Sequence, residues 1–305
     1  ASNGTIKAIA TKPPWFWVWK PRHRDRQNSM KDSEPILRLE NVHKAFGETV
    51  VLDGVDLKIY AGQTTVIIGP SGCGKSVLLK HMVGLLCPDS GCVFFRKHKI
   101  SSLSEKKMVP IRRRMGFLFQ SSALFDSMTV EQNVCFPLVE HNVGMRARQR
   151  HRCREVLSLV GLDGLQGRYP EELSGGQKKR VALARAIALG PQVIFYDEPT
   201  TALDPIRADL INELILKLQR ALGNTAVIVT HDMASVRKVA NRILMLHSGK
   251  FILDTTPDDL DDVTDEVVSR FINGQASPKE LAEIQTGQLG PEKTPPEKSS
   301  GETQE

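Results

Sequence analysis

Short apolar runs alternate with amphipathic stretches along the second half of the chain. Residues 193–196 and 226–229 are continuous apolar runs, which is typical of buried parallel strands. Residues 177–187, 209–222 and 233–240 place their apolar side chains at helical spacing. Strands that alternate with helices in this way favour a parallel sheet with helices on both faces, so the predicted fold class is α/β.

The first part of the chain has a different pattern. Residues 36–39, 50–52 and 55–59 alternate apolar and polar positions, which predicts antiparallel strands with one buried face. Residues 126–172 are predicted to be helical. We therefore expect an antiparallel region and a helical region beside the parallel sheet.

Composition narrows the function classes. Hydrophobic residues make up 40% and charged residues 25% of the 305 residues, which is typical of a globular chain. No apolar run approaches the roughly 18 residues that cross a bilayer, so no membrane span is predicted. The five cysteines lack paired C-x-x-C spacing, which favours free thiols in a reducing compartment. The net charge is +6, but the basic stretch 96–114 has no interleaved aromatic residues, so we do not expect nucleic acid as a partner.

Both ends of the chain fall outside the predicted domain of residues 35–274. Residues 1–34 are expected to be a leader extension that is disordered, or absent from the natural protein if Met30 is its start. The alternative is that the aromatic cluster at residues 15–19 and the basic run after it contact a membrane interface. Residues 275–305 are rich in Pro, Glu, Lys, Gly and Ser, which predicts a disordered tail.

The strongest chemical motif is a glycine-rich loop between an apolar strand at residues 64–68 and a helix predicted over residues 77–86. The loop fits G-x-x-x-x-G-K-[ST], which binds nucleoside triphosphates. Its glycines let backbone N–H groups surround phosphate oxygens, and the helix N-terminus adds partial positive charge. Lys75 is predicted to reach the β- and γ-phosphates, and Ser76 to ligate Mg²⁺. The predicted nucleotide-binding residues here are Gly69, Pro70, Ser71, Gly72, Cys73, Gly74, Lys75, Ser76 and Val77.

An acidic pair, Asp197 and Glu198, ends the apolar run 193–196. Ligands of parallel α/β sheets bind at the carboxyl ends of the strands. We expect Asp197 to hold Mg²⁺ and Glu198 to polarise the attacking water as a general base. Alone, such a pair is as often a solvated strand end, but behind a phosphate loop it favours nucleotide hydrolysis.

A third motif is Leu-Ser-Gly-Gly-Gln at residues 173–177, before a basic helix. Ser174 is suited to cap that helix, and Gly175 and Gly176 expose backbone N–H groups at its positive end. The motif is thus a second anion-binding device, with a simple capped turn as the alternative. It resembles the signature of the ABC (ATP-binding cassette) ATPases, and this resemblance extends over residues 36–272.

The resemblance implies the ABC ATPase fold: a P-loop NTPase parallel sheet with an antiparallel β subdomain and an inserted helical subdomain at about residues 121–180. Phe46 would stack on adenine. Gln120 would contact Mg²⁺, the attacking water and the membrane partner. Asp204 would lie in the loop that crosses to the other subunit, and His231 would contact the γ-phosphate.

ABC ATPases enclose ATP and Mg²⁺ between two cassettes, so the resemblance implies a homodimer. The signature residues that would act on the ATP of the other copy are Ser174, Gly175, Gly176 and Gln177. Glu198, His231 and Gln120 would be the catalytic residues of an ATPase. ATP binding would close the dimer, and the segment around Gln120 would transmit the motion to transmembrane permease subunits.

Residues 121–141 and 267–274 resemble the ATPases of the Mla-type phospholipid transporters, which work with a permease and an MCE-domain lipid-binding protein. One departure is Gln177, where members of that subgroup often carry methionine. The predicted substrate is phospholipid, moved across or between envelope membranes. An amino-acid-type importer and a soluble ABC ATPase without a permease are the alternatives. The predicted place is the cytoplasmic face of the bacterial inner membrane or, if Ala1 follows a removed transit peptide, the stromal face of the plastid inner envelope.

Overall fold

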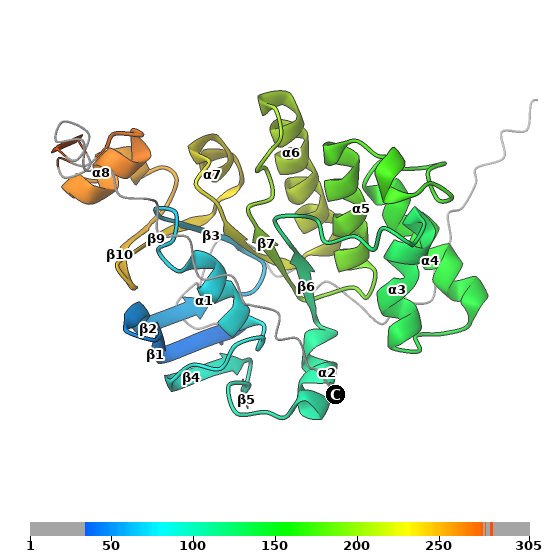
Figure 1. The fold of residues 1–305 in the computed structure, drawn as a ribbon, viewed down its shortest axis with the longest axis horizontal. Helices are drawn as coiled ribbons and strands as arrows, with labels where there is room; N and C mark the ends of the chain where they lie inside the picture. Colours follow the sequence, from blue (N-terminus) through cyan, green and yellow to red (C-terminus); the bar gives the residue numbers. More distant parts are fainter. Residues whose placement is uncertain (1–33, 277, 279–280, 283–305) are drawn as a thin grey trace, which may run out of the picture. The chain divides into compact units, whose positions relative to one another are not determined.

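The computed structural model describes residues 34–276, 278 and 281–282. The predicted leader (1–34) and tail (275–305) lie almost entirely outside the described residues, so both stay predictions. Two sheets and a set of surrounding helices form the described part (Figure 1). Within it, no helix combines the length and the apolar character that crossing a membrane requires. All five cysteines are free thiols.

The larger sheet is mainly parallel. Its strands are β3 (Thr64–Ile68), β6 (Met115–Leu118), β7 (Val193–Asp197), β8 (Thr225–Val229), β9 (Arg242–His247) and β10 (Lys250–Thr255). They lie in the order β10-β9-β3-β8-β7-β6, and of these pairs only β10–β9 is antiparallel. Every residue of β3, β7 and β8 is buried, as the continuous apolar runs predict.

The smaller sheet is antiparallel. Its strands are β1 (Leu37–Phe46), β2 (Thr49–Ile59), β4 (Ser90–Phe95) and β5 (His98–Lys99), in the order β2-β1-β4-β5. The prediction of separate strands at 50–52 and 55–59 is wrong, because both belong to β2. A register shift opposite β1 accommodates Asp53 and Gly54, which has a φ of 71°, so the strand continues through a bulge.

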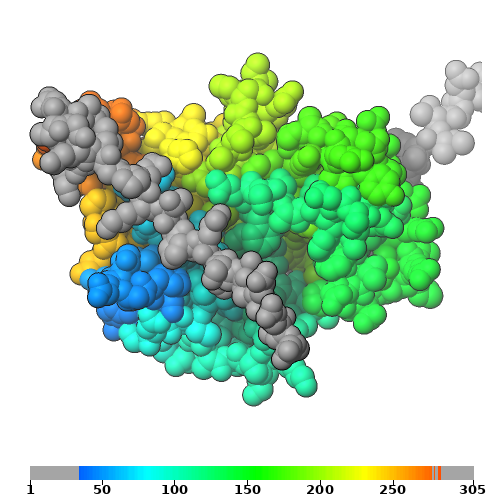
Figure 2. Space-filling model, in the orientation of Figure 1, coloured from blue at the N-terminus to red at the C-terminus, as the bar shows by residue number. Residues whose placement is uncertain are grey.

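Helices surround the larger sheet, and those of residues 130–187 form most of the green region on one side of Figure 1. They are α1 (Lys75–Met82), α2 (Glu105–Arg112), α3 (Val130–Glu140), α4 (Arg146–Leu159), α5 (Gly175–Ile187), α6 (Pro205–Leu222), α7 (Met233–Val239) and α8 (Glu266–Ile272), with 3₁₀ turns at Pro170–Glu172 and Leu260–Asp262. In the space-filling view, the antiparallel strands (blue to cyan) and the helical region (green) occupy separate parts of the surface (Figure 2).

The first helix is shorter than predicted. We expected a helix over 77–86, but α1 ends at Met82. Gly84 has a φ of 67°, and the N–H groups of Gly84 and Leu85 donate to the carbonyls of His81 and Lys80 at 3.1 and 2.8 Å. This is a Schellman ending, in which a left-handed glycine closes the helix.

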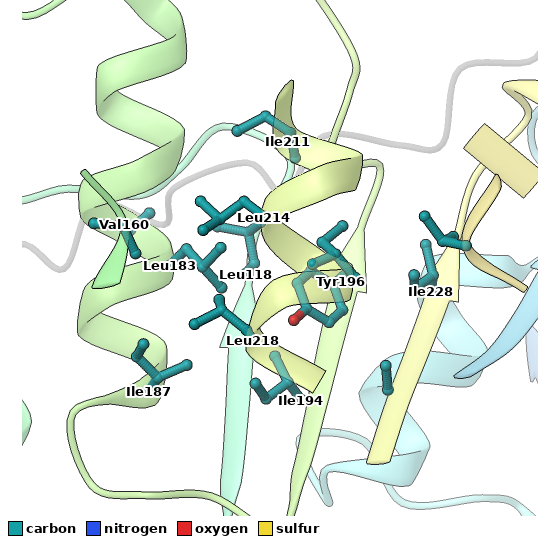
Figure 3. Close-up of a cluster of buried hydrophobic side chains, with 14 of the residues drawn as sticks. Leu118, Val160, Leu183, Ile187, Ile194, Tyr196, Ile211, Leu214, Leu218 and Ile228 are labelled. Atoms are coloured by element: carbon teal, nitrogen blue, oxygen red, sulfur yellow. The ribbon is translucent and has the colours of Figure 1, made fainter. Parts of the chain in front are cut away.

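A buried cluster packs α5 and α6 against the larger sheet (Figure 3). Leu183 of α5, Leu214 and Leu218 of α6 and Tyr196 of β7 belong to this cluster, and Tyr196 is 1% exposed. A second cluster lies between the two sheets and α1. The α/β fold class is confirmed, and this packing fixes the strand end that carries Asp197.

Candidate functional site

The glycine-rich loop joins β3 to α1 in a conformation that needs its glycines. Gly69 has a φ of 148°, and a Cβ there would lie 2.2 Å from the carbonyl oxygen of Leu246. Gly74 has a φ of 102°, and a Cβ there would lie 2.7 Å from Cγ1 of Val51. Side chains at these positions would clash with neighbouring segments of the chain, so this loop conformation requires glycine at both positions.

The ammonium group of Lys75 lies over this loop. It donates to the carbonyl oxygens of Gly69 and Pro70, both at 2.8 Å, and the residue is only 7% exposed. Burial raises the pKa of the neighbouring Cys73 thiol, and the charge of Lys75 opposes that rise. The loop thus presents one buried cation at the start of a helix, an arrangement suited to phosphate groups.

Ser76 and Asp197 meet across two elements. The hydroxyl of Ser76, on α1, donates to Oδ1 of Asp197, at the end of β7, at 3.0 Å. Burial raises the pKa of Asp197, the Ser76 hydrogen bond opposes this, and the charge of Glu198 adds to it. A hydroxyl and a carboxylate side by side supply the oxygen ligands that Mg²⁺ prefers, so these residues fit the predicted metal.

The carboxylate of Glu198 is held on both oxygens. Oε1 lies 2.9 Å from Nδ1 of His231, and Oε2 accepts from the hydroxyls of Thr201 at 3.1 Å and Thr230 at 3.4 Å. Glu198 is 9% exposed and has a φ of 49°, an uncommon backbone conformation for a side chain other than glycine. Sequence reasoning missed both threonines, because nothing in their spacing indicates which way their hydroxyls point.

Gln120 follows β6 and is exposed. Its backbone carbonyl accepts a hydrogen bond of 2.6 Å from Nζ of Lys179, which also donates to the carbonyl of Glu198 at 3.3 Å. The structure therefore links Gln120 to the acidic pair through a lysine that sequence reasoning did not single out. The available signal was its place three and four residues before the buried Ala182 and Leu183, on the buried face of α5.

The signature motif begins α5 with a capping box. Oγ of Ser174 accepts from the Gln177 N–H at 3.3 Å, and Oε1 of Gln177 accepts from the Ser174 N–H at 2.9 Å. Ser174 and Gly175 are exposed, and Gly176 is half-buried. Among the described residues, no hydrogen bond joins Ser174 or Gln177 to the phosphate loop or the acidic pair. The predicted cap is therefore present, and the role toward a second copy stays a prediction.

Asp204 caps the neighbouring helix α6, where its Oδ1 accepts from the Arg207 N–H at 3.0 Å. A groove of about 550 Å³ runs between the start of α5 and α6. Ser174 and Gly176 line one wall of it, and Arg207 and Leu214 line the other. The signature thus lies beside the first turn of α6, which Asp204 caps.

Phe46 ends β1 and is 46% exposed. Nζ of Lys44 lies 5.3 Å from the ring centroid. Asp89 fixes this turn, since its carboxylate accepts from Nζ of Lys44 at 2.6 Å and from the Ala45 N–H at 2.7 Å. An exposed ring on a fixed turn can stack on a flat aromatic ligand.

Comparison with known proteins identifies the family. The profile described as "ABC transporter" matches residues 52–201. The TRIGALACTOSYLDIACYLGLYCEROL 3 protein, chloroplastic, of Arabidopsis thaliana is 37% identical over 260 residues, which cover 80% of this chain and 75% of that protein. The probable ribonucleotide transport ATP-binding protein mkl of Mycobacterium tuberculosis is 37% identical over 257 residues, 84% of this chain and 71% of that protein. The methionine import ATP-binding protein MetN of Rhizobium johnstonii is 40% identical over 228 residues, 75% of this chain and 63% of that protein.

Solved structures agree with this assignment. A dimeric, post-hydrolysis structure of the ATP-binding cassette MJ0796, bound to ADP and Pi, matches with a TM-score of 0.67 and 36% identity. The match covers 72% of this chain and 98% of that chain. The fold, the phosphate loop and the relatives agree, and the chain belongs to the ABC transporter family as an ATP-binding, ATP-hydrolysing subunit.

Proposed function

We propose that this chain works as a homodimer on transmembrane permease subunits and powers the movement of phospholipid across or between envelope membranes. An MCE-domain lipid-binding protein completes the proposed complex. The dimer would lie at the cytoplasmic face of a bacterial inner membrane or at the stromal face of a plastid inner envelope. The observation that carries the ATPase site is a pair of direct hydrogen bonds at two consecutive carboxylates: Ser76 bonds Asp197, and His231 bonds Glu198.

Each of these residues has a proposed task. Lys75 binds the β- and γ-phosphates, and Phe46 stacks on adenine. Ser76 and Asp197, with Gln120, would hold Mg²⁺, which when bound neutralises charge on the phosphate oxygens. Glu198 takes a proton from the attacking water, and the contact between its Oε1 and Nδ1 of His231 fixes the direction of the carboxylate.

The second copy would supply the signature. The exposed Ser174 caps α5 and the exposed Gly175 is its first residue, so the Ser174 hydroxyl and the positive helix end are suited to the γ-phosphate of ATP on the other copy. Asp204, which caps α6, would contact the second copy. The dimeric form of MJ0796 with ADP and Pi supports this arrangement.

The phospholipid proposal competes chiefly with an amino-acid-type importer. The plastid relative is named for a galactolipid, and MetN is named for methionine import, at 37% and 40% identity. We favour phospholipid because residues 121–141 and 267–274 resemble the Mla-type ATPases. Affinity purification from native membranes in mild detergent decides between them. A permease with an MCE-domain protein supports phospholipid, and a permease with an amino-acid-binding protein supports the importer.

The catalytic proposal is tested with Glu198→Gln. The amide keeps the shape of the side chain but cannot take a proton, so ATP affinity should stay unchanged while kcat falls by about 100-fold or more. Glu213→Gln, a surface carboxylate of α6 paired with Lys238, is the matched control and should keep full activity. Normal hydrolysis by Glu198→Gln would exclude the general-base role.

A further inference from the structure

Lys179 is a buried cation between two segments of the ATPase site. The residue is 5% exposed, and its ammonium group donates to the backbone carbonyls of Gln120 at 2.6 Å and Glu198 at 3.3 Å. Burial lowers its pKa, and the charges of Glu198 and Asp197 oppose that fall. A buried charge is retained only where partners compensate it, and here those partners are the backbones of two site residues.

The same helix holds the segment after Gln120 at a second point. Arg185, further along α5, donates to the carbonyls of Ser122 at 3.0 Å and Ala123 at 2.7 Å. These two residues have φ values of 65° and 46°, a left-handed backbone that non-glycine residues rarely adopt. Side chains of α5 thus hold this segment in an unfavourable conformation at three carbonyls.

We propose that Lys179 is a positioning residue for ATP hydrolysis, which ties the Gln120 segment and the end of β7 to the signature helix. The proposal rests on the functions proposed above for Gln120, Glu198 and Ser174. Because Ser174 is the N-cap of α5, any shift of α5 when Ser174 meets the ATP of a second copy moves both backbone segments together. Hydrolysis would thereby depend on the dimer contact, and the same movement would reach the segment that contacts the permease.

Lys179→Met tests this in the full chain, purified with its membrane subunits. Methionine keeps an unbranched apolar side chain but removes all three N–H donors. We expect kcat to fall roughly 10- to 100-fold, since displacement of a catalytic group by about 1 Å has such effects. ATP affinity should stay within about twofold, because the contacts that Lys75 makes within the phosphate loop are untouched. Lys178→Met, one residue earlier on α5, should keep the wild-type kcat and KM.

A variant with retained donors separates positioning from general damage. Lys179→Gln keeps an N–H₂ group without the charge and should show a kcat between those of Lys179→Met and the wild type. If Lys179→Met does not unfold cooperatively, Lys179→Gln replaces it, and a lowered kcat at unchanged ATP affinity supports the proposal.

Two results would overturn it: a folded variant with wild-type kcat, or a loss of ATP affinity that parallels the loss of kcat. Failure of the proposed function would give a different result. In that case Glu198→Gln itself would hydrolyse ATP normally, whatever the behaviour of Lys179→Met.

Discussion

We expect Ser174 to have two separable roles, which are to cap α5 and to contact the ATP of a second copy. Thr129, which caps α3, is a control within the same chain. The capping box of Ser174 and Gln177 on α5 has a counterpart in Thr129 and Gln132 on α3. The side-chain acceptor distances are 3.3 Å in both boxes, and the reciprocal bonds are 2.9 and 2.8 Å. Substitution by alanine therefore removes the same local interaction at both helices, but only Ser174 belongs to the signature.

The expected loss of stability is equal for the two variants. Replacement of an N-cap serine or threonine by alanine costs about 1 kcal/mol. In a domain of this size, 1 kcal/mol lowers Tm by about 2–4 °C. Ser174→Ala should in addition lose a donor to the phosphoryl group of the partner-bound ATP, and removal of one such donor lowers kcat by roughly 100-fold.

The assay pairs thermal unfolding with steady-state ATP hydrolysis, and adds ATP-dependent dimerisation followed by light scattering in the Glu198→Gln background. Ser174→Ala and Thr129→Ala should show similar Tm values, while only Ser174→Ala loses hydrolysis and the dimer. Equal losses of hydrolysis in both variants would attribute the effect to helix stability. Full activity of Ser174→Ala would refute a role of Ser174 in the second copy's site.

Two further predictions concern the contact of Phe46 with adenine and the protonation of Asp197, a proposed metal ligand. Phe46→Ala should raise the Kd for ATP roughly tenfold through lost stacking, with Phe46→Trp as control; an equal rise for inorganic tripolyphosphate would contradict it. Burial raises the pKa of Asp197, so the folded protein favours the protonated carboxyl. This contribution to the free energy of unfolding is present in full below the ordinary pKa of 3.8 and is lost as pH rises through the folded pKa. Without Mg²⁺, Asp197→Asn should therefore exceed the wild-type Tm at neutral pH and approach it toward about pH 4. Asp258→Asn, on the surface, should show no such trend, and a wild-type Tm for Asp197→Asn at every pH would refute the reasoning.

Local spacing was enough to predict several features. The phosphate loop, the N-cap at Ser174 and the strand that ends at Asp197 depend on neighbouring residues, so their conformations are encoded where they occur. The two wrong element boundaries, in β2 and at the end of α1, lie at glycines. Gly54 continues β2 through a bulge, and Gly84 ends α1 before its apolar spacing does. Glycine permits both outcomes, and only the tertiary pairing decides between them.

The meeting of the site residues required the order of the strands, which spacing does not encode. β8 lies between β3 and β7, so His231, after β8, comes beside Glu198, after β7, while Ser76, after β3, reaches Asp197. A motif scan would find each residue without showing that they touch. Thr230 and Lys179 hold the site through contacts with residues distant in sequence. Thr201 lies three residues after Glu198, but its spacing does not show that its hydroxyl points to that carboxylate. Of these residues, only Lys179 is indicated by the sequence, because it is a charged residue on the buried face of a helix. A charged residue at a position where the helical pattern calls for an apolar one indicates a function, and here that function is to link α5 to the site.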